Sequence, residues 1–392
     1  MKKNVLFVIA NNYFPEDIRV YNESTTLSEE EGYNCYVLTP KKKGEKTKEI
    51  VNNITCYRFP YFDAASVIGL VFEYILVSFF IMVLAPVIVF RKKIHVIHLA
   101  NPPDHLILLV YWLKIFNVKI IFDHHDLAVE VIKGKFQSEK SILLKILVSV
   151  FTFFEKISLR LADHVITSNN SIKENDQKII KKNEIVVVRN SNKIQFNNIE
   201  EIPKKKNEVL HLGYFGVIGN DRAAGLDNII LIAKELIKRK VPFIFTVIGD
   251  GPGFMTLKEL INNEKIEEYF DMRGFVPLND AIKEIIHFDF GILPWPDIPK
   301  NHFLSAIKII NYMCCGVPVC SLKLKEQLIT TQGIGIFSDD FNTMADSIID
   351  VYKDEQEYDL MRKRTLERFN KFLCWEIQKM ELIHIYNNLF KK

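Results

Sequence analysis

The sequence predicts an α/β protein made of two Rossmann-like, doubly wound domains that face a cleft. Its 392 residues exceed the roughly 250 to 300 at which a single hydrophobic core stops growing. Short apolar runs alternate with amphipathic stretches along the chain, a pattern typical of parallel sheets covered by helices on both faces. One charged, proline-containing stretch, Glu200–Asn207, interrupts this alternation. We therefore expect the interdomain linker there.

The composition indicates a folded protein, with 48% hydrophobic and 25% charged residues. The net charge of +3 is uneven: residues 1–200 hold 26 Lys+Arg against 21 Asp+Glu (+5), which leaves 25 against 27 (−2) for residues 201–392. The basic first half suits an anionic lipid surface or a phosphorylated acceptor, and an ordinary solvated surface is the alternative. No stripe of basic residues interleaved with aromatics indicates nucleic acid. The six cysteines lack metal-site spacing and suggest free thiols in the cytoplasm.

In the first half, the chain enters directly into the apolar run Val5–Ala10. This run is too short for a signal peptide and lacks a cleavage site, so it is interpreted as the first core strand. The expected strands are Val5–Ala10, Cys35–Thr39, Val96–Leu99, Lys119–Phe122, His164–Thr167 and Ile185–Val188. The expected helices are Asp17–Glu31, Asp104–Phe116 and Ser141–Leu161.

Residues 64–90 form the most apolar segment. Tyr74–Phe90 is apolar apart from Ser78 and ends at the positive flank Arg91–Lys93, which is at the short limit for crossing a bilayer. A single crossing would separate Val5–Ala10 from Val96–Leu99, although one sheet needs both. Two interpretations remain: a helix or helical hairpin dipping into the membrane interface, or a helix buried in the first domain. The second apolar helix, Ser141–Leu161, and nearby basic residues favour peripheral association with the inner face of the plasma membrane.

The second half repeats the alternation. The expected strands are Val209–Tyr214, Phe243–Ile248, Phe270–Arg273, Phe290–Leu293 and Val317–Cys320. The expected helices are Gly225–Lys238, Phe254–Asn262, Asn279–Ile286, Ser305–Cys315 and Trp375–Phe390.

Several motifs follow one another between Val209 and Cys320. They are Gly213–Gly216 after a strand, Gly249–Pro252, Arg273–Pro277, and Lys308 ahead of Tyr312–Val319. In this order they resemble the donor-binding domain of the GT-B glycosyltransferases, in particular glycosyltransferase family 4. The resemblance covers almost the whole chain. It implies an acceptor domain (1–200) containing the apolar segment 64–90, a nucleotide-sugar donor domain (201–370), and a terminal helix (371–392) that crosses back to the first domain.

Transfer from a nucleotide sugar requires that the leaving diphosphate be neutralised, which fixed cations and a helix N-terminus can do without metal. Lys308 lies in the first turn of an expected helix, and Ser305 is placed to cap that helix. The resemblance implies that Lys308 binds the diphosphate. Arg222 could replace a cation that the family carries in the preceding loop, or be a solvated loop residue. No Asp-x-Asp pair occurs, so we expect no metal and no cofactor besides the nucleotide-sugar substrate.

Other donor contacts follow from the resemblance. Gly216 and Gly249 permit tight turns beside the ligand, and Phe275 with Val276 matches the loop whose backbone contacts the nucleobase. Phe303 and Asn311 stand where family members commonly carry two glutamates. Asn311 can still hydrogen-bond a ribose, whereas Phe303 cannot replace a carboxylate, and this leaves the donor sugar open.

In the first domain, Asp17 and Arg19 match the family's opening motif and, with Asn12, are expected to bind the acceptor. Asp17 could instead serve only as a helix cap. His125 and Asp126 end a strand, where doubly wound sheets place ligand contacts. The resemblance puts His125 near the transferring sugar, helped by Asp126. A structural turn, or a metal pair without an evident third ligand, are the alternatives.

These observations predict a retaining, metal-independent glycosyltransferase. We expect it to use a UDP-sugar and a lipid-linked or saccharide acceptor in the synthesis of a bacterial surface polysaccharide. A GT-B-like sugar-nucleotide epimerase and a catalytically inactive GT-B binding protein are the alternatives.

Overall fold

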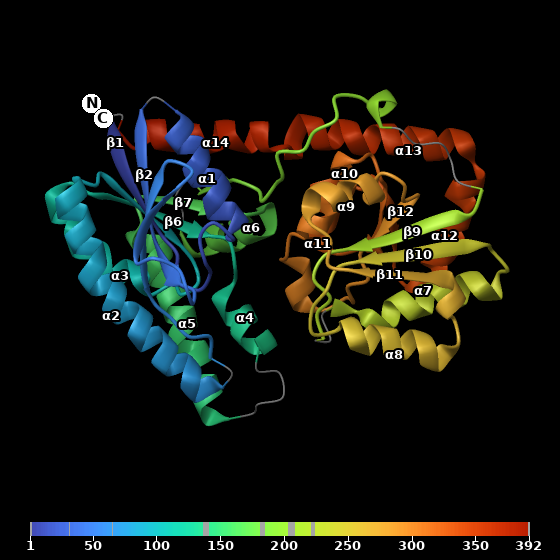
Figure 1. The fold of residues 1–392 in the computed structure, drawn as a ribbon, viewed down its shortest axis with the longest axis horizontal. Helices are drawn as coiled ribbons and strands as arrows, with labels where there is room; N and C mark the ends of the chain where they lie inside the picture. The colour runs from blue at the N-terminus through green and yellow to red at the C-terminus, as the bar shows by residue number, and fades with distance from the viewer. Residues whose placement is uncertain are drawn as a thin grey trace. The chain divides into compact units, whose positions relative to one another are not determined.

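The structure is a computed structural model that describes residues 2–30, 32–64, 66–135, 141–180, 185–202, 208–220 and 224–390. It divides into two compact units, Met1–Asn190 with Lys379–Lys392, and Ser191–Gln378 (Figure 1). Both are parallel-sheet α/β units of Rossmann type, which confirms the predicted fold class. The division precedes the expected linker because residues 191–202 pack with the second unit: Asn192 bonds Asn311, and Ile202 joins that unit's core.

The first unit is built on a sheet whose eight described strands have the order β3-β4-β2-β1-β5-β6-β7-β8. All neighbours pair in parallel except the edge pair β3 and β4. The strands are β1 (Lys3–Val8), β2 (Tyr33–Lys41), β3 (Lys48–Val51), β4 (Ile54–Pro60), β5 (Val96–Ala100), β6 (Lys119–His124), β7 (His164–Thr167) and β8 (Ile185–Val187).

Helices cover both faces of this sheet, because alternate residues of its buried strands point to opposite sides. On one face, Leu6 and Val8 pack with α2, α3 and α5. On the other face, Val5 and Phe7 pack with α1 and the last helix, α14. The helices of the unit are α1 (Ile18–Glu29), α2 (Val67–Lys92), α3 (Leu106–Val110) continued by the 3-10 turn η1 (Tyr111–Phe116), α4 (Ala128–Lys135), α5 (Ile142–Leu161), α6 (Asn170–Ile179) and the end of α14 (Trp375–Asn388).

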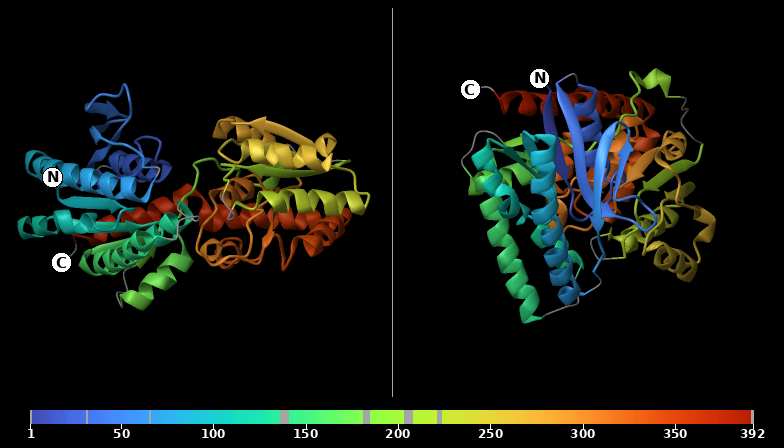
Figure 2. Two further views of the ribbon diagram at one scale, coloured as in Figure 1. Left: turned by 90° about the horizontal axis from the view of Figure 1, so that it is seen from below. Right: turned by 60° about the vertical axis from the view of Figure 1, so that its left-hand side comes forward.

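Residues 67–90 of the apolar segment belong to one helix, α2, and not to a helical hairpin. Ser66 caps its first turn, accepting a hydrogen bond from the backbone N–H of Gly69, and Lys93 ends it in the left-handed conformation. By length and composition alone α2 could cross a membrane. However, 28% of its most apolar 18-residue stretch is buried inside the unit. Val77, Ile81 and Ala85 pack on the sheet. The interpretation as a helix buried in the first domain therefore holds for one face of α2, whereas its other face is exposed. Figure 2 (right) shows α2 beside α5.

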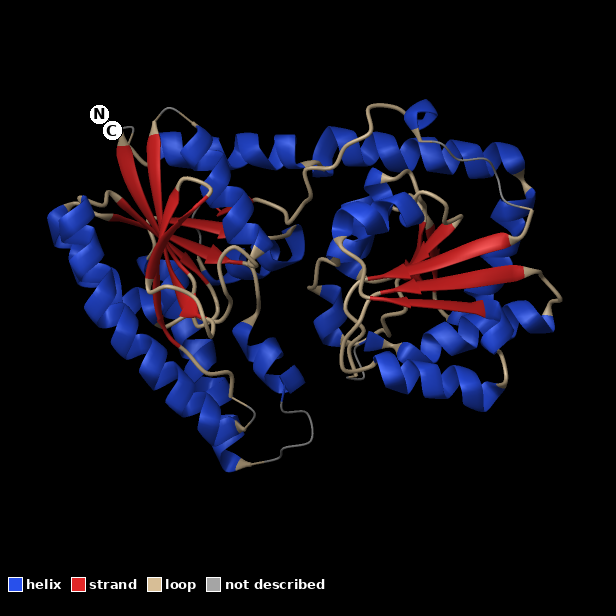
Figure 3. Ribbon diagram, viewed as in Figure 1, coloured by secondary structure: helices blue, strands red, loops and turns tan. Residues whose placement is uncertain are grey.

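The second unit contains a sheet whose six described strands are all parallel, in the order β11-β10-β9-β12-β13-β14 (Figure 3). The strands are β9 (Leu210–Phe215), β10 (Phe243–Ile248), β11 (Phe270–Gly274), β12 (Phe290–Ile292), β13 (Val319–Leu322) and β14 (Ile336–Ser338). The helices are α7 (Leu226–Lys238), α8 (Phe254–Glu264), α9 (Leu278–Ile285), α10 (Ile307–Cys314), α11 (Lys325–Thr331), α12 (Phe341–Lys353), α13 (Glu355–Arg368) and the start of α14. The strand order reverses between β9 and β12. An open parallel sheet binds ligands at such a switch point.

Candidate active site

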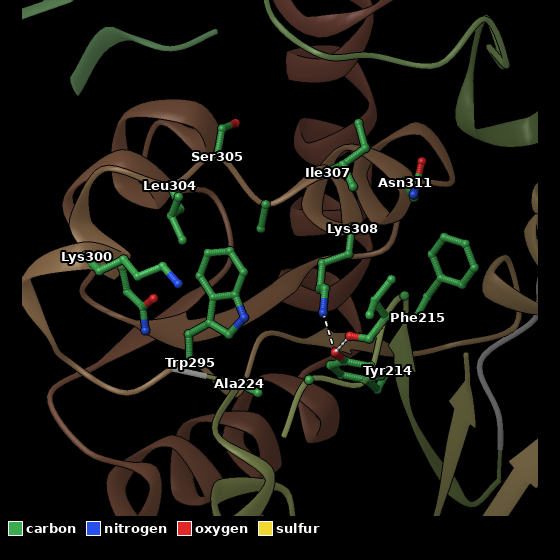
Figure 4. Close-up of a pocket in the computed structure, with 15 residues that line it drawn as sticks. Tyr214, Phe215, Ala224, Trp295, Lys300, Leu304, Ser305, Ile307, Lys308 and Asn311 are labelled. Atoms are coloured by element: carbon green, nitrogen blue, oxygen red, sulfur yellow. Dashed lines mark hydrogen bonds between the residues drawn. The ribbon is translucent and has the colours of Figure 1, made fainter. Parts of the chain in front are cut away.

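A pocket of about 340 Å³ lies at this switch point in the second unit. One wall follows the carboxyl end of β9, through Phe215, Gly216 and Val217, and the opposite wall comprises Trp295 after β12 and the start of α10 (Figure 4). The pocket therefore combines a glycine-containing turn with a helix N-terminus, the usual elements of an anion site.

Lys308 extends from the first turn of α10 into this pocket. Its Nζ donates a hydrogen bond of 2.5 Å to the Tyr214 hydroxyl and lies 3.9 Å from the centre of the Tyr214 ring (Figure 4). The residue is 7% exposed, and no ion pair joins it to a carboxylate among the described residues. Burial lowers the pKa of Lys308 to about 7. Within the part of the chain that the structure describes, the pocket thus holds a buried amine without a carboxylate partner.

Ser305 does not cap α10, so that prediction is wrong. The helix begins at Ile307, and Ala306 takes the N-cap position without a side-chain hydrogen bond. Ser305 instead lines the pocket together with Ala306 and Ile307. Because the first-turn N–H groups of a helix have no intrahelical acceptors, an uncapped start leaves them for a ligand.

Gly216 and Gly249 occupy turns that exclude side chains. Gly216 has a φ of 125°, and a Cβ there would lie 3.3 Å from Cε of Lys308. Gly249 has a φ of 148°, and its Cβ would meet the Gly216 carbonyl oxygen at 1.9 Å. The two turns therefore approach each other more closely than a residue with a side chain at position 216 or 249 would permit.

Asn311 lines the same pocket one turn after Lys308. Its Oδ1 accepts a hydrogen bond of 2.7 Å from Nδ2 of Asn192, which fixes the amide. Phe303 is not among the lining residues, whereas Asn301 and Leu304 are. The position where family members carry a carboxylate thus contributes no acidic side chain to this pocket.

The other donor residues lie on neighbouring loops. The Gly249 N–H donates to the Gly274 carbonyl at 2.7 Å, which ties the turn after β10 to the loop holding Phe275 and Val276. Phe275 is 76% exposed, and Val276 packs against the core of the second unit. Arg222 lies outside the described residues.

In the first unit, His125 directly follows β6. Its Nδ1 lies 3.3 Å from Oδ2 of Asp123, and its side chain is 13% exposed. Burial acts to lower the pKa of His125, but the Asp123 carboxylate outweighs it and the pKa is raised. The Asp123 carboxylate therefore lies beside one nitrogen of the ring as its ion-pair partner.

Arg19 is buried behind this histidine. Its guanidinium donates two bonds of 2.6 Å to Asp123 and one of 2.7 Å to the Val188 carbonyl. These contacts contradict the predicted acceptor contact of Arg19, because a buried, bidentate guanidinium is not available to a substrate. Burial would raise the pKa of Asp123, but the Arg19 charge holds it well below its usual range.

Asn101 fixes the backbone on the other side of His125. Its Oδ1 accepts the N–H groups of His125 and Asp126 at 2.9 and 3.1 Å, and its Nδ2 donates to the Asp126 carbonyl at 2.6 Å. Asp126 is half-buried. The strand-end turn is therefore held by a side chain from the neighbouring strand end, β5.

Two further buried clusters adjoin this turn. Behind Asp123, Nδ1 of His98 lies 2.8 Å from the Tyr386 hydroxyl, and its Nε2 lies 3.4 Å from Glu23. His124 contacts Asp176 at 2.9 Å and Glu155 at 3.7 Å. Burial acts to lower the pKa of His124, but the Asp176 carboxylate and its neighbours raise it to about 10. Asp176 and Glu155 thus provide the negative charge beside a buried imidazolium. The sequence alone did not place either carboxylate beside His124.

Asn12 and Asp17 make local contacts. Oδ1 of Asp17 accepts the Val20 N–H at 3.0 Å and caps α1, while Nδ2 of Asn12 donates to Oδ2 of Asp17 at 3.3 Å. A helix cap was the alternative role that the sequence indicated for Asp17, and the structure shows this cap. Contact of either residue with an acceptor stays a prediction.

Sequence reasoning missed Tyr214, Trp295, Asn101 and Asp123 as parts of the two sites. Tyr214 and Lys308 are 94 positions apart, and Asn101 is 24 positions from His125. The position of each residue at or just after a strand end was the available signal.

Comparison with known proteins adds family matches to this geometry. The model of Glycosyltransferase Family 4 matches residues 18–191, and that of glycosyl transferases group 1 matches residues 210–354. A chitobiosyldiphosphodolichol beta-mannosyltransferase of Debaryomyces hansenii is 24% identical over 322 residues. That match covers 71% of this chain and 65% of the relative's length.

Solved structures share the fold at low sequence identity. Sucrose-phosphate synthase from Thermosynechococcus elongatus has a TM-score of 0.75 at 13% identity, over 99% of both chains. Anabaena Alr3699/HepE in complex with UDP has a TM-score of 0.66 at 12% identity, over 98% of this chain and all of that one.

Proposed function

The chain is a GT4-type glycosyltransferase of GT-B fold, and on this premise we propose that it transfers a sugar from a UDP-sugar to a lipid-linked acceptor, with retention of configuration and without a metal. The buried amine of Lys308 carries the proposal. A lysine that lacks a carboxylate partner in a pocket is costly to the protein. A diphosphate supplies the missing negative charge.

The pocket suits the chemistry of the leaving group. Negative charge builds on the diphosphate as the glycosidic bond breaks, and preorganised donors stabilise it most in a site that excludes water. Lys308 and the uncapped start of α10 meet in the pocket and provide such donors. With this set, the residues of the chain neutralise the leaving group themselves.

We assign His125 a contact with the transferring sugar. Asp123 and Asn101 fix its ring and backbone, so the histidine is oriented before substrate arrives. In a retaining transfer the leaving phosphate can itself draw the proton of the acceptor hydroxyl, which leaves His125 to orient and stabilise. The anomeric configuration of the product, measured by NMR against that of the donor, tests retention.

The relatives support the choice of substrates. The Anabaena structure holds UDP, and the name of the Debaryomyces protein describes a saccharide joined to a lipid through a diphosphate. Calorimetric titration with UDP, GDP and dTDP tests the nucleotide. Tight binding of UDP alone is the expected result, and binding of none of the three would leave the transferase proposal without support.

We expect UDP affinity to fall as the pH rises above 7. With a pKa of about 7 before the diphosphate binds, Lys308 loses its proton in this range, whereas the bound diphosphate requires the ammonium. Binding then takes up a proton, and the affinity should fall by up to about tenfold per pH unit. Titrations between pH 7 and 9, in two buffers of different ionisation enthalpy, measure both quantities. An affinity that is constant over this range would contradict the proposed state of Lys308.

We also propose that the first unit associates with a membrane surface. Ile68 and Phe72 of α2 are 63% and 62% exposed, and Ile142 of α5 is 76% exposed. In a flotation assay with anionic vesicles, Ile68→Gln/Phe72→Gln should reduce the bound fraction about tenfold, since each buried CH₂ contributes about 0.8 kcal/mol. Ile50→Gln, at an equally exposed site on strand β3, is the matched control. Equal flotation of both variants would reject this proposal.

A further inference from the structure

A second hollow, of about 460 Å³, lies in the first unit among α2, α3 and α5. Val71, Phe79 and Met82 line it from α2, Leu109 from α3, and Leu147 and Val150 from α5. No residue among the described lining is charged. We call this hollow the apolar groove.

Besides Tyr74, the groove has two polar residues, Ser78 and His105, and these form a hydrogen bond with each other. Oγ of Ser78 and Nε2 of His105 lie 2.6 Å apart. Burial lowers the pKa of His105 to about 4, so its ring is neutral at physiological pH. Apart from the Tyr74 hydroxyl, the groove therefore presents only apolar side chains and this hydrogen-bonded pair to a ligand, which suits an uncharged apolar segment.

The rim of the groove is apolar as well. Ile75, Phe79 and Met82 are each at least half exposed, at 59%, 54% and 50%. Basic side chains of the same helices, Lys145 and Arg91, are exposed but do not line the groove. A ligand with a hydrocarbon chain and an anionic end matches this arrangement, because the chain enters the groove and the charge stays outside it.

The groove adjoins the turn that carries His125. His105, on its wall, follows Asn101 by four positions, and Asn101 binds the backbone of His125 and Asp126. Nδ2 of Asn101 also donates to Asp104, the neighbour of His105, at 2.9 Å. On the other side, α4 begins just after Asp126 and packs through Ala128 and Ile132 on Phe151 of the groove wall. The groove and the His125 turn thus share their supporting residues.

From this connection we infer that the apolar groove binds the hydrocarbon chain of a lipid-phosphate-linked acceptor, whose polar end extends to the His125 turn. The inference rests on the proposed function and selects a lipid-linked acceptor over a free saccharide. A second copy of the chain would need no link to His125. A bulk phospholipid would need none either, so the continuity of groove and turn favours the acceptor.

Filling the groove tests this inference. Val150→Trp places an indole on the groove wall, whereas Ile146→Trp places one on an exposed site of the same helix, one turn away and outside the lining. The probe is farnesyl phosphate below its critical micelle concentration, titrated against the full chain, with inorganic phosphate as the headgroup control. We expect Val150→Trp to weaken farnesyl phosphate binding by at least about tenfold, the effect of excluding roughly two methylene groups. Ile146→Trp should bind like the unmodified protein, and inorganic phosphate should not bind measurably.

Other outcomes would overturn the inference. Equal binding by the two variants would place the chain on the open surface, and binding of phospholipid vesicles lost only in Val150→Trp would assign the groove to bulk lipid. Dissociation of a dimer in Val150→Trp, seen by light scattering, would assign it to a second copy. UDP titration of the same samples distinguishes failure of the two proposals. If the unmodified protein does not bind UDP, the result counts against the proposed transferase function. If it binds UDP but not farnesyl phosphate, the result counts against the proposed role of the groove.

Discussion

Lys308→Met is expected to reduce kcat/KM by about 10³-fold while leaving the protein folded. The substitution removes the buried ammonium group of the pocket and leaves Lys300 as the other lysine of the lining, and a charge-assisted contact in a buried site is worth several kcal/mol in the transition state. Methionine keeps the volume and the apolar stem. Because no carboxylate among the described residues pairs with the amine, we expect no decrease of the melting temperature. Transfer assays with a UDP-sugar and thermal unfolding of both proteins measure the two quantities.

A lysine elsewhere in the second unit provides the control. Lys283 is exposed on α9 and pairs with Asp280, so Lys283→Met should retain the activity of the unmodified protein. The pH dependence of UDP affinity should also disappear in Lys308→Met. Unchanged kcat/KM in this variant would remove the basis for placing the diphosphate beside α10.

His125→Ala is expected to reduce kcat by about 10²- to 10⁴-fold with little change in UDP affinity. The imidazole belongs to the first unit, whereas the diphosphate pocket belongs to the second, so the two measurements separate the roles. The expected size is that of a group which stabilises charge or moves a proton in the transition state. Single-turnover transfer and UDP calorimetry are the measurements.

Two further variants sharpen this result. Asp123→Asn removes the charge that raises the pKa of His125, so any dependence of kcat on protonation of His125 should shift to lower pH. His384→Ala changes an exposed histidine of α14 and should leave kcat unchanged. An unchanged kcat in His125→Ala would mean that the strand-end turn is only structural.

The buried strands could be predicted closely because both of their faces are covered. Phe243–Ile248 and His164–Thr167 have the bounds expected from their apolar runs. The edge strand Lys48–Val51 and its neighbour Ile54–Pro60 were missed, since both mix polar and apolar residues and carry charges instead of forming a continuous apolar run. The expected helix Asp104–Phe116 consists of a short α-helix and a 3-10 turn, a change of hydrogen bonding that periodicity does not reveal.

In the candidate site, motifs could be predicted from the sequence, whereas contacts between distant residues could not. Motif spacing identified Lys308, and its position at a helix start is as expected. Arg19 was assigned to a substrate because a sequence does not distinguish a buried guanidinium from an exposed one. Its partners Asp123 and Val188 are 104 and 169 positions away, so only the fold shows that they satisfy it. The same distance hid the contact of Tyr214 with Lys308.

The last helix has a consequence for how the protein is made. Leu382, Ile385 and Tyr386 complete the core on one face of the first sheet, and Tyr386 is the hydrogen-bond partner of the buried His98. In a nascent chain that has emerged only as far as Asn190, this face of the sheet is therefore covered by α1 but lacks the side chains of α14. The core of the first unit is therefore completed only after the whole second unit has been synthesised, because Leu382, Ile385 and Tyr386 follow that unit in the chain.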